Sequence, residues 1–134
     1  MSPLITLAAL AGQPNCGKST AFNALTGANQ HGANYPGVTV DKMVGWRRFD
    51  GRKFEIVDLP GTYSLTSFSP EERVSRDFLL NERPALVINV VDASNLKGSL
   101  YLTLQLLEME LPLLLNLNMM DIVADRGMKI DVDE

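Results

Sequence analysis

Residues 12–20 read Gly12-Gln13-Pro14-Asn15-Cys16-Gly17-Lys18-Ser19-Thr20, and this stretch decides the fold. It fits the pattern GxxxxGK[ST], with an apolar, strand-like run before it and a helix-like run after it, which makes a chance glycine turn a poor explanation. Gly12 and Gly17 let the backbone wrap a polyphosphate with its N–H groups facing inward, at a helix N-terminus that favours anions. Lys18 then brings positive charge to the terminal phosphates, and the Ser19 hydroxyl is placed to bind Mg²⁺.

Strand-like and helix-like segments alternate outward from this loop. The hydrophobic patterns predict strands at residues 5–11, 42–49, 52–59, 85–91 and 113–117, and helices at residues 18–25, 70–81 and 95–110. Asp50-Gly51 predicts a tight hairpin, the one antiparallel pair of the sheet. Residues 27–37, rich in Gly, Asn and Pro, are expected to form a long irregular loop with a switching role. The whole pattern predicts a three-layer α/β fold of the P-loop GTPase kind, with a mostly parallel sheet. Ligands of such sheets bind at the carboxyl ends of the strands.

Two short motifs after the phosphate loop resemble nucleotide switches. Asp58-Leu59-Pro60-Gly61 follows a predicted strand, where the carboxylate can reach Mg²⁺ through a water and the Gly61 N–H can face the γ-phosphate. Thr39, in Gly37-Val38-Thr39-Val40, is the natural second hydroxyl ligand of Mg²⁺ and is engaged only when the γ-phosphate is present. Each motif alone is weak evidence. In this order they predict two loops that are released on hydrolysis.

The end of the next predicted strand carries a motif that indicates which nucleotide base is bound, Asn118-Met119-Met120-Asp121. The Asp121 carboxylate can accept from both N1–H and the exocyclic amine of guanine, a donor pair that adenine lacks. Asn118 would hold the neighbouring loop and the base edge. The motif therefore predicts selection of GTP or GDP over adenine nucleotides. Met119 stands where many GTPases have a lysine that covers the base, so we expect looser affinity and fast nucleotide release.

The residues leave the route of hydrolysis open. Thr62 occupies the position where Ras-like proteins place a water-orienting glutamine, and no arginine is obviously placed as an internal finger. A monovalent cation such as K⁺ could do the arginine's work. Asn15 has a side-chain carbonyl suited to bind that cation, and equally it could only stabilise the loop.

Composition limits the alternatives. The 134 residues fit one domain, and a net charge of −4 disfavours nucleic acid as a partner. The single cysteine, Cys16, and the single histidine, His31, make a poor metal pair and give no indication that iron binds here. No stretch reaches the roughly 18 apolar residues that a membrane-spanning helix needs, so we expect a soluble piece.

Five segments together resemble the GTP-binding domain of the ferrous iron transport protein B family, from about residue 5 to residue 122. They are GQPNCGKSTAFNALTG, GANYPGVTVDK, VDLPGTYSLTSFSPEE, VVDASNLKGSLYLTLQLLE and LNMMD. The resemblance implies a cytosolic N-terminal domain, on the cytoplasmic face of the bacterial inner membrane. In that family a helical domain and a polytopic membrane region that moves Fe(II) follow, and these would be partners within the parent protein. It also implies a potassium-activated mechanism with Asn15 as the K⁺ ligand, and a methionine at position 119 is similar to the family pattern.

The sequence covers less than the whole GTP-binding domain of the family. The family's domain continues through a further strand, with a second base-contacting loop, and a closing helix, whereas this sequence stops at Glu134. We therefore expect a truncated piece, without the helical and membrane domains. Its uncovered sheet edge would favour association into a homo-oligomer.

Three functions remain in competition. The first is GTP hydrolysis coupled to iron transport. The second is a potassium-dependent GTPase of ribosome assembly or RNA modification, against which the acidic balance and the family-specific segments argue. The third is an inert nucleotide-binding fragment.

The candidate site follows from these motifs. The predicted catalytic residues are Asn15, Lys18, Thr39 and Gly61. The predicted metal ligands are Ser19, Thr39 and Asp58 for Mg²⁺, and Asn15 for K⁺. The predicted nucleotide-binding residues are Gly12, Gln13, Pro14, Asn15, Cys16, Gly17, Lys18, Ser19, Thr20, Gly37, Val38, Thr39, Asp58, Leu59, Pro60, Gly61, Asn118, Met119 and Asp121.

Overall fold

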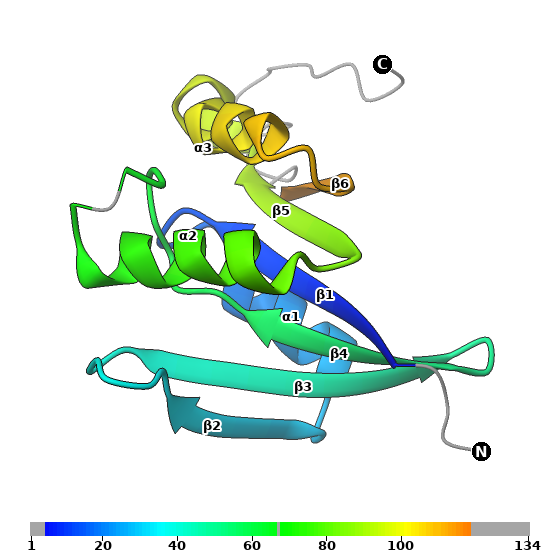
Figure 1. The fold of residues 1–134 in the computed structure, drawn as a ribbon. Helices are drawn as coiled ribbons and strands as arrows, with labels where there is room; N and C mark the ends of the chain where they lie inside the picture. Colours follow the sequence, from blue (N-terminus) through cyan, green and yellow to red (C-terminus); the bar gives the residue numbers. More distant parts are fainter. Residues whose placement is uncertain (1–4, 67, 119–134) are drawn as a thin grey trace.

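A computed structural model describes residues 5–66 and 68–118. They form a six-stranded sheet in the order β2-β3-β4-β1-β5-β6, with helices on both faces (Figure 1). The strands are β1 (Ile5–Gly12), β2 (Gln30–Asn34), β3 (Asp41–Phe49), β4 (Arg52–Asp58), β5 (Leu86–Asp92) and β6 (Leu113–Asn118). The helices are α1 (Lys18–Thr26), α2 (Pro70–Glu82) and α3 (Leu96–Glu108), the last preceded by a 3₁₀ turn at Ala93–Asn95. The predicted α/β class and mostly parallel sheet are confirmed.

The parallel centre of the sheet places the motifs side by side. β1 pairs in parallel with β4 on one side and β5 on the other, and β5 pairs in parallel with β6. The register sets Leu10 opposite Asp58 and Gly12 opposite Val90. The phosphate loop, the Asp58 motif and the end of β5 therefore meet at one edge, the carboxyl ends of the parallel strands.

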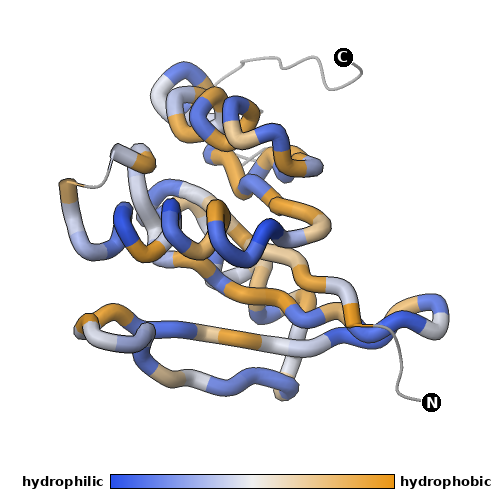
Figure 2. Tube along the Cα trace, in the orientation of Figure 1, coloured by the Kyte–Doolittle hydropathy of each residue, from blue (hydrophilic) through white to orange (hydrophobic). Residues whose placement is uncertain are grey.

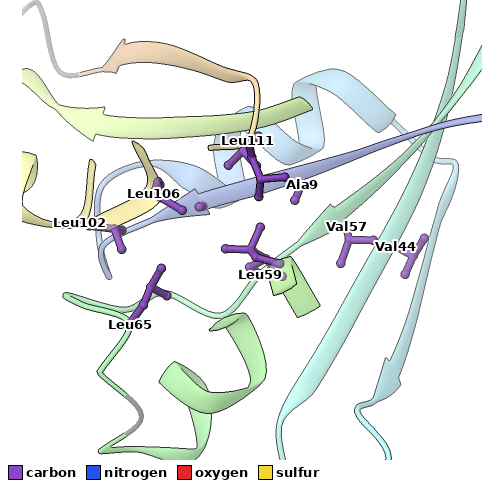
Figure 3. Packing of buried hydrophobic residues seen from close by; sticks show 11 residues of the cluster. Ala9, Val44, Val57, Leu59, Leu65, Leu102, Leu106 and Leu111 are labelled. Carbon is purple, nitrogen blue, oxygen red and sulfur yellow. The ribbon is translucent and has the colours of Figure 1, made fainter. Parts of the chain in front are cut away.

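Alternation along β1 builds a separate core on each face of the sheet. Ala9 and Ala11 face the cluster that includes Leu79 of α2 and Leu102 and Leu106 of α3 (Figure 3). Ala8 and Leu10 face the opposite cluster, which includes Phe22 of α1. Because successive strand residues point to opposite faces, a fully apolar strand such as β1 can serve both cores.

The prediction of an irregular loop over residues 27–37 is wrong for residues 30–34. These residues form β2, which pairs antiparallel with β3 in the register Gln30–Gly45 through Asn34–Asp41. The strand is held by backbone pairing at the sheet edge. Four of its five residues are exposed, so its sequence shows no alternation of hydrophobic and polar residues. Figure 2 shows the consequence, since β2 lacks the continuous hydrophobic colour of the central strands.

The hairpin prediction is confirmed, but the expectation that it is the one antiparallel pair is wrong, because β2 and β3 are also antiparallel. β3 and β4 are antiparallel neighbours joined at Asp50 and Gly51, which have φ angles of 53° and 75°. Two consecutive positive φ angles are what the tight turn between twisted strands requires.

None of the helices in residues 5–66 and 68–118 has the length and the apolar character that a membrane-spanning helix needs.

Leu102→Ala tests the core on the α3 face. Leu102 is 1% exposed, so truncation should leave a cavity and lower the free energy of unfolding by about 2–5 kcal/mol. The matched control is Leu104→Ala on the same helix, where the side chain is 58% exposed and the loss should stay below about 0.5 kcal/mol. Urea unfolding followed by circular dichroism measures both. Equal losses would contradict the assignment of the buried face of α3.

Candidate functional site

The loop between β1 and α1 folds back tightly over the end of its strand. A Cβ on Gly12 would lie 2.7 Å from the Cys16 Sγ and 2.8 Å from the Val90 carbonyl oxygen, so only glycine fits. Gly17 has a φ of 90° and Asn15 a φ of 64°, both in the left-handed region. The backbone thereby turns directly into the N-terminus of α1, where free N–H groups and the helix dipole favour an anion.

This loop borders a cavity of about 510 Å³. Its lining comprises Gln13, Pro14, Asn15, Gly17, Lys18, Ser19 and Gly61. Phosphate-loop residues and the glycine of the Asp58 motif are thus brought to one cavity. Cys16 is different, since its thiol is 2% exposed and packs in the α1-side core. Cys16 is not among the residues that line this cavity.

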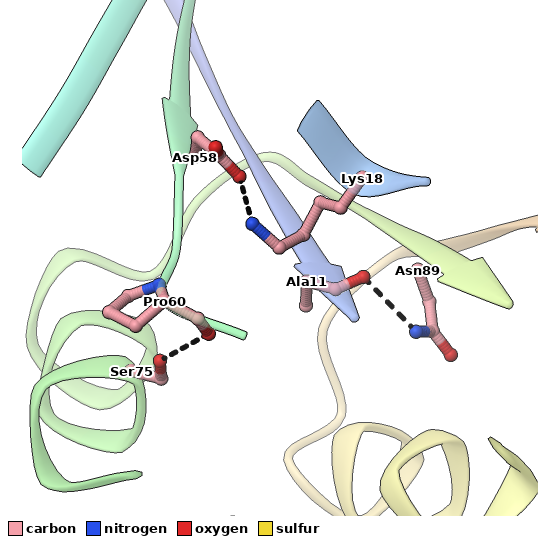
Figure 4. A network of polar contacts seen from close by, with 6 residues as sticks. All are labelled: Ala11, Lys18, Asp58, Pro60, Ser75 and Asn89. Atoms are coloured by element: carbon pink, nitrogen blue, oxygen red, sulfur yellow. Dashed lines mark hydrogen bonds and ion pairs between the residues drawn. The ribbon is translucent and has the colours of Figure 1, made fainter. Parts of the chain in front are cut away.

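Lys18 and Asp58 form an ion pair at the centre of the site (Figure 4). Their side chains are 10% and 12% exposed, so the pair is largely shielded from water. Burial raises the pKa of Asp58 above its ordinary value, and the neighbouring Lys18 ammonium opposes that rise. Breaking the pair without a substitute partner would leave a buried charge uncompensated. The pair therefore joins β4 to the first turn of α1.

A second cavity, of about 320 Å³, borders both partners of this ion pair. Its lining includes Lys18, Thr39, Asp58, Pro60 and Glu71. Of the three predicted Mg²⁺ ligands, Thr39 and Asp58 line this cavity and Ser19 lines the first. Lys18 belongs to both.

The donor set of these three residues suits Mg²⁺. Two hydroxyls and one carboxylate are hard oxygen donors, which Mg²⁺ prefers, and it commonly completes its shell with water and phosphate oxygens. Among residues 5–66 and 68–118, no group of three or more His, Cys, Asp or Glu side chains could hold a metal by itself.

Backbone hydrogen bonds attach the Asp58 motif to β1 and the phosphate loop. The Leu59 N–H donates to the Leu10 carbonyl at 3.0 Å, and the Thr62 N–H donates to the Gly12 carbonyl at 3.1 Å. Between them Gly61 lies so close that an added Cβ would be 3.1 Å from the Pro14 backbone. The Leu59 side chain is 1% exposed and belongs to the core on the α2 and α3 face. Gly61 is thus held against the phosphate loop.

The Pro60 carbonyl is contacted from α2. The Ser75 hydroxyl donates to it at 3.5 Å, and Ser75 is 2% exposed (Figure 4). Asn89 of β5, also buried, donates from Nδ2 to the Ala11 carbonyl at 3.2 Å and accepts from the Thr103 hydroxyl of α3. These contacts hold the strand ends from α2 and α3, which pack on the same face of the sheet.

The predicted base-reading motif is only partly described. Asn118 Nδ2 donates to the Cys16 carbonyl at 2.9 Å, so it ties the end of β6 to the phosphate loop. Met119 and Asp121 lie outside the described residues.

The turn that carries Thr39 contains a residue that sequence reasoning missed. The Tyr35 N–H donates to the Val40 carbonyl at 3.0 Å, and the Val38 N–H donates to the Tyr35 carbonyl at 3.3 Å, with Gly37 at a φ of 77°. Tyr35 is 8% exposed, and its buried hydroxyl has no hydrogen-bond partner among the described residues. Burial first, and the Asp58 charge second, raise the pKa of Tyr35 to about 12. The sequence offered one signal for the buried Tyr35, since it is an aromatic residue within a segment rich in Gly, Asn and Pro.

Comparisons with known proteins agree with this geometry. The sequence matches the family described as "Ferrous iron transport protein B" over residues 6–134. It is 58% identical over 101 residues to the "Fe(2+) transporter FeoB" of Methanocaldococcus jannaschii, an alignment that covers 75% of this chain and 15% of that protein. The chain therefore spans a small part of the length of this curated relative.

Solved structures show the same fold. A mutant of the S. thermophilus NFeoB, solved with GDP bound, matches with a TM-score of 0.90 and 48% identity, over 96% of this chain and 50% of that one. The FeoB G-domain from Methanococcus jannaschii matches with a TM-score of 0.85 and 51% identity, over 97% of this chain and 78% of that one.

The environment of Cys16 predicts slow thiol chemistry. Burial raises the pKa of the Cys16 thiol above its ordinary value of 9.0, with smaller opposing effects from Lys18, so little thiolate forms at pH 8. Labelling of the folded chain with a disulfide reagent should be at least about tenfold slower than labelling in 8 M urea, and its onset should lie at higher pH. Equal rates in both states would contradict the burial of this side chain.

Proposed function

This chain belongs to the ferrous iron transport protein B family, and we propose that it binds guanine nucleotide and hydrolyses GTP to GDP and phosphate. The observation that carries the proposal is the position of Lys18, a residue that lines both cavities and whose side chain pairs with Asp58. A GDP-bound relative with a TM-score of 0.90 supports the choice of nucleotide.

The ion pair suggests how binding proceeds. Nucleotide phosphates offer Lys18 a new anionic partner in the first cavity, at the N-terminus of α1. Asp58 then needs another compensating charge, because a buried carboxylate without a partner is costly. Ser19, Thr39 and Asp58 are the residues that would hold Mg²⁺, which when bound supplies positive charge to the phosphates. Asp58 would thus exchange Lys18 for Mg²⁺ when the phosphates bind Lys18. This exchange would couple phosphate binding in the first cavity to Mg²⁺ binding beside the second.

Gly61 and Asn15 are the proposed hydrolytic residues. Gly61 lines the phosphate cavity, and its N–H is the proposed donor to the γ-phosphate. Asn15 lines the same cavity and is exposed, so its side-chain carbonyl is accessible as the K⁺ ligand that the family resemblance implies. Thr62 is 6% exposed and offers no replacement for a water-orienting glutamine.

The base and the parent protein complete the proposal. Asp121 would accept from N1–H and the amine of guanine, while Asn118 holds the base loop to the phosphate loop through Cys16. The chain would act as the N-terminal GTP-binding domain of a longer Fe(2+) transporter, at the cytoplasmic face of its membrane. Its helical and membrane domains would be its partners. Family membership argues against the RNA-associated GTPase.

Potassium dependence tests the role of Asn15. GTP turnover with Mg²⁺ should be at least about tenfold faster in K⁺ than in Na⁺ at equal ionic strength, because K⁺ supplies charge that an arginine finger supplies elsewhere. Asn15→Ala should abolish the difference while GDP affinity changes by less than about threefold. Phosphate release and calorimetric titration measure the two quantities. Equal turnover in both salts would remove the cation mechanism.

Asp121→Ala tests guanine selection. Loss of two charge-assisted hydrogen bonds should weaken GDP binding by at least about tenfold. ADP binding, which does not use this carboxylate, should be unchanged and weak. If ATP is turned over as fast as GTP by the unsubstituted chain, the role of Asp121 is refuted.

A further inference from the structure

Helix α3 contains none of the nucleotide-binding candidates, yet it touches both parts of the site. The Gln13 side chain of the phosphate loop donates to the Gly98 carbonyl at 2.8 Å. The Leu65 N–H, in the segment after the Asp58 motif, donates to the Gln105 Oε1 at 2.7 Å. The helix therefore holds the two loops that border the phosphate cavity.

The contact of Gln105 with Leu65 fixes the segment through both main chain and side chain. Leu65 is 7% exposed and lies in the same core cluster as Leu102 and Leu106 of α3 (Figure 3). Its amide, 40 residues from Gln105 in sequence, would be a half-buried donor without a partner if the Gln105 oxygen were lost.

The other end of this segment is fixed as well. Thr62 donates to the Gly12 carbonyl at 3.1 Å, and Gly61 lies against Pro14. The three peptide steps from Thr62 to Leu65 span at most about 11 Å when extended. Such a short span leaves Gly61 little freedom once Leu65 is held on α3.

We infer that Gln105 is a positioning residue for GTP hydrolysis, which holds Leu65 on α3 and thereby keeps the Gly61 N–H at the phosphate cavity. The inference rests on the proposed function. Gln105 lines neither of the two cavities, whereas the residues proposed to bind the nucleotide are residues 12–20 and the base motif. Its loss should therefore reduce kcat more than it changes KM or GDP affinity.

Gln105→Leu is the test, because it removes the acceptor and keeps an apolar stem beside the core. In saturating GTP with Mg²⁺ and K⁺, kcat should fall about tenfold, while GDP affinity stays within about threefold. Amide hydrogen exchange at Leu65 should become at least about tenfold faster, as expected for loss of one protecting hydrogen bond.

Two further variants control for general damage to α3. Gln105→Glu keeps an oxygen acceptor and should restore most of kcat and of the Leu65 protection. Glu108→Leu replaces an exposed polar residue in the last turn of the same helix and should leave both unchanged. A loss of kcat in Glu108→Leu equal to that in Gln105→Leu would overturn the inference.

The outcomes separate the inference from the function beneath it. If the unsubstituted chain turns over GTP and Gln105→Leu leaves kcat and Leu65 exchange unchanged, the inference is overturned and the proposed function stands. If Gln105→Leu lowers GDP affinity as much as kcat, Gln105 is only structural and the inference is also overturned. If the unsubstituted chain turns over no GTP in either salt, the proposed function fails and the inference fails with it.

Discussion

The ion pair between Lys18 and Asp58 is the interaction on which the site depends. It requires a strand end, a glycine-bordered loop and a helix N-terminus to meet, and the parallel pairing of β1 with β4 provides the meeting by setting Leu10 opposite Asp58. Two largely buried charges satisfy each other there, so neither can leave without a replacement. A polyanion and a divalent cation are together the natural replacement, since one suits the ammonium and the other the carboxylate. The charge balance of the site thus favours binding both or neither.

The two cores explain why this site is rigid on one side and adjustable on the other. Alternate residues of β1 pack against α1 or against α2 and α3, so the strand that leads into the phosphate loop is held from both faces. The Asn89 side chain adds a buried link from α3 to the Ala11 carbonyl, directly before Gly12. By contrast, Thr39 sits in a turn closed by its own backbone and packed through Tyr35. In the proposed function, motion on nucleotide exchange should therefore concentrate in that turn.

Much of the fold and the chemistry of the site could be predicted from the sequence, because both are encoded locally. Mostly apolar runs mark β1 and β5, Asp50-Gly51 marks the hairpin, and the loop glycines mark a conformation that few other residues adopt. β2 was missed because an edge strand of polar residues is stabilised by its neighbour's backbone, which leaves no pattern of its own. The contacts of Gln105 with Leu65 and of Asn118 with Cys16 join residues 40 and 102 positions apart. Such pairs follow from packing and register, and no local pattern reveals them.

The buried Tyr35 hydroxyl, which has no hydrogen-bond partner in the part of the chain that the structure describes, has an energetic consequence for the loop that carries Thr39. A buried donor without an acceptor generally costs about 1–3 kcal/mol. Any rearrangement that gives the phenol an acceptor recovers that amount, enough to change the ratio of two loop populations by about 5- to 150-fold. Tyr35 therefore has two opposing effects on the turn. Packing of its ring stabilises the present conformation, whereas its hydroxyl reduces the free-energy difference to a conformation that offers it an acceptor.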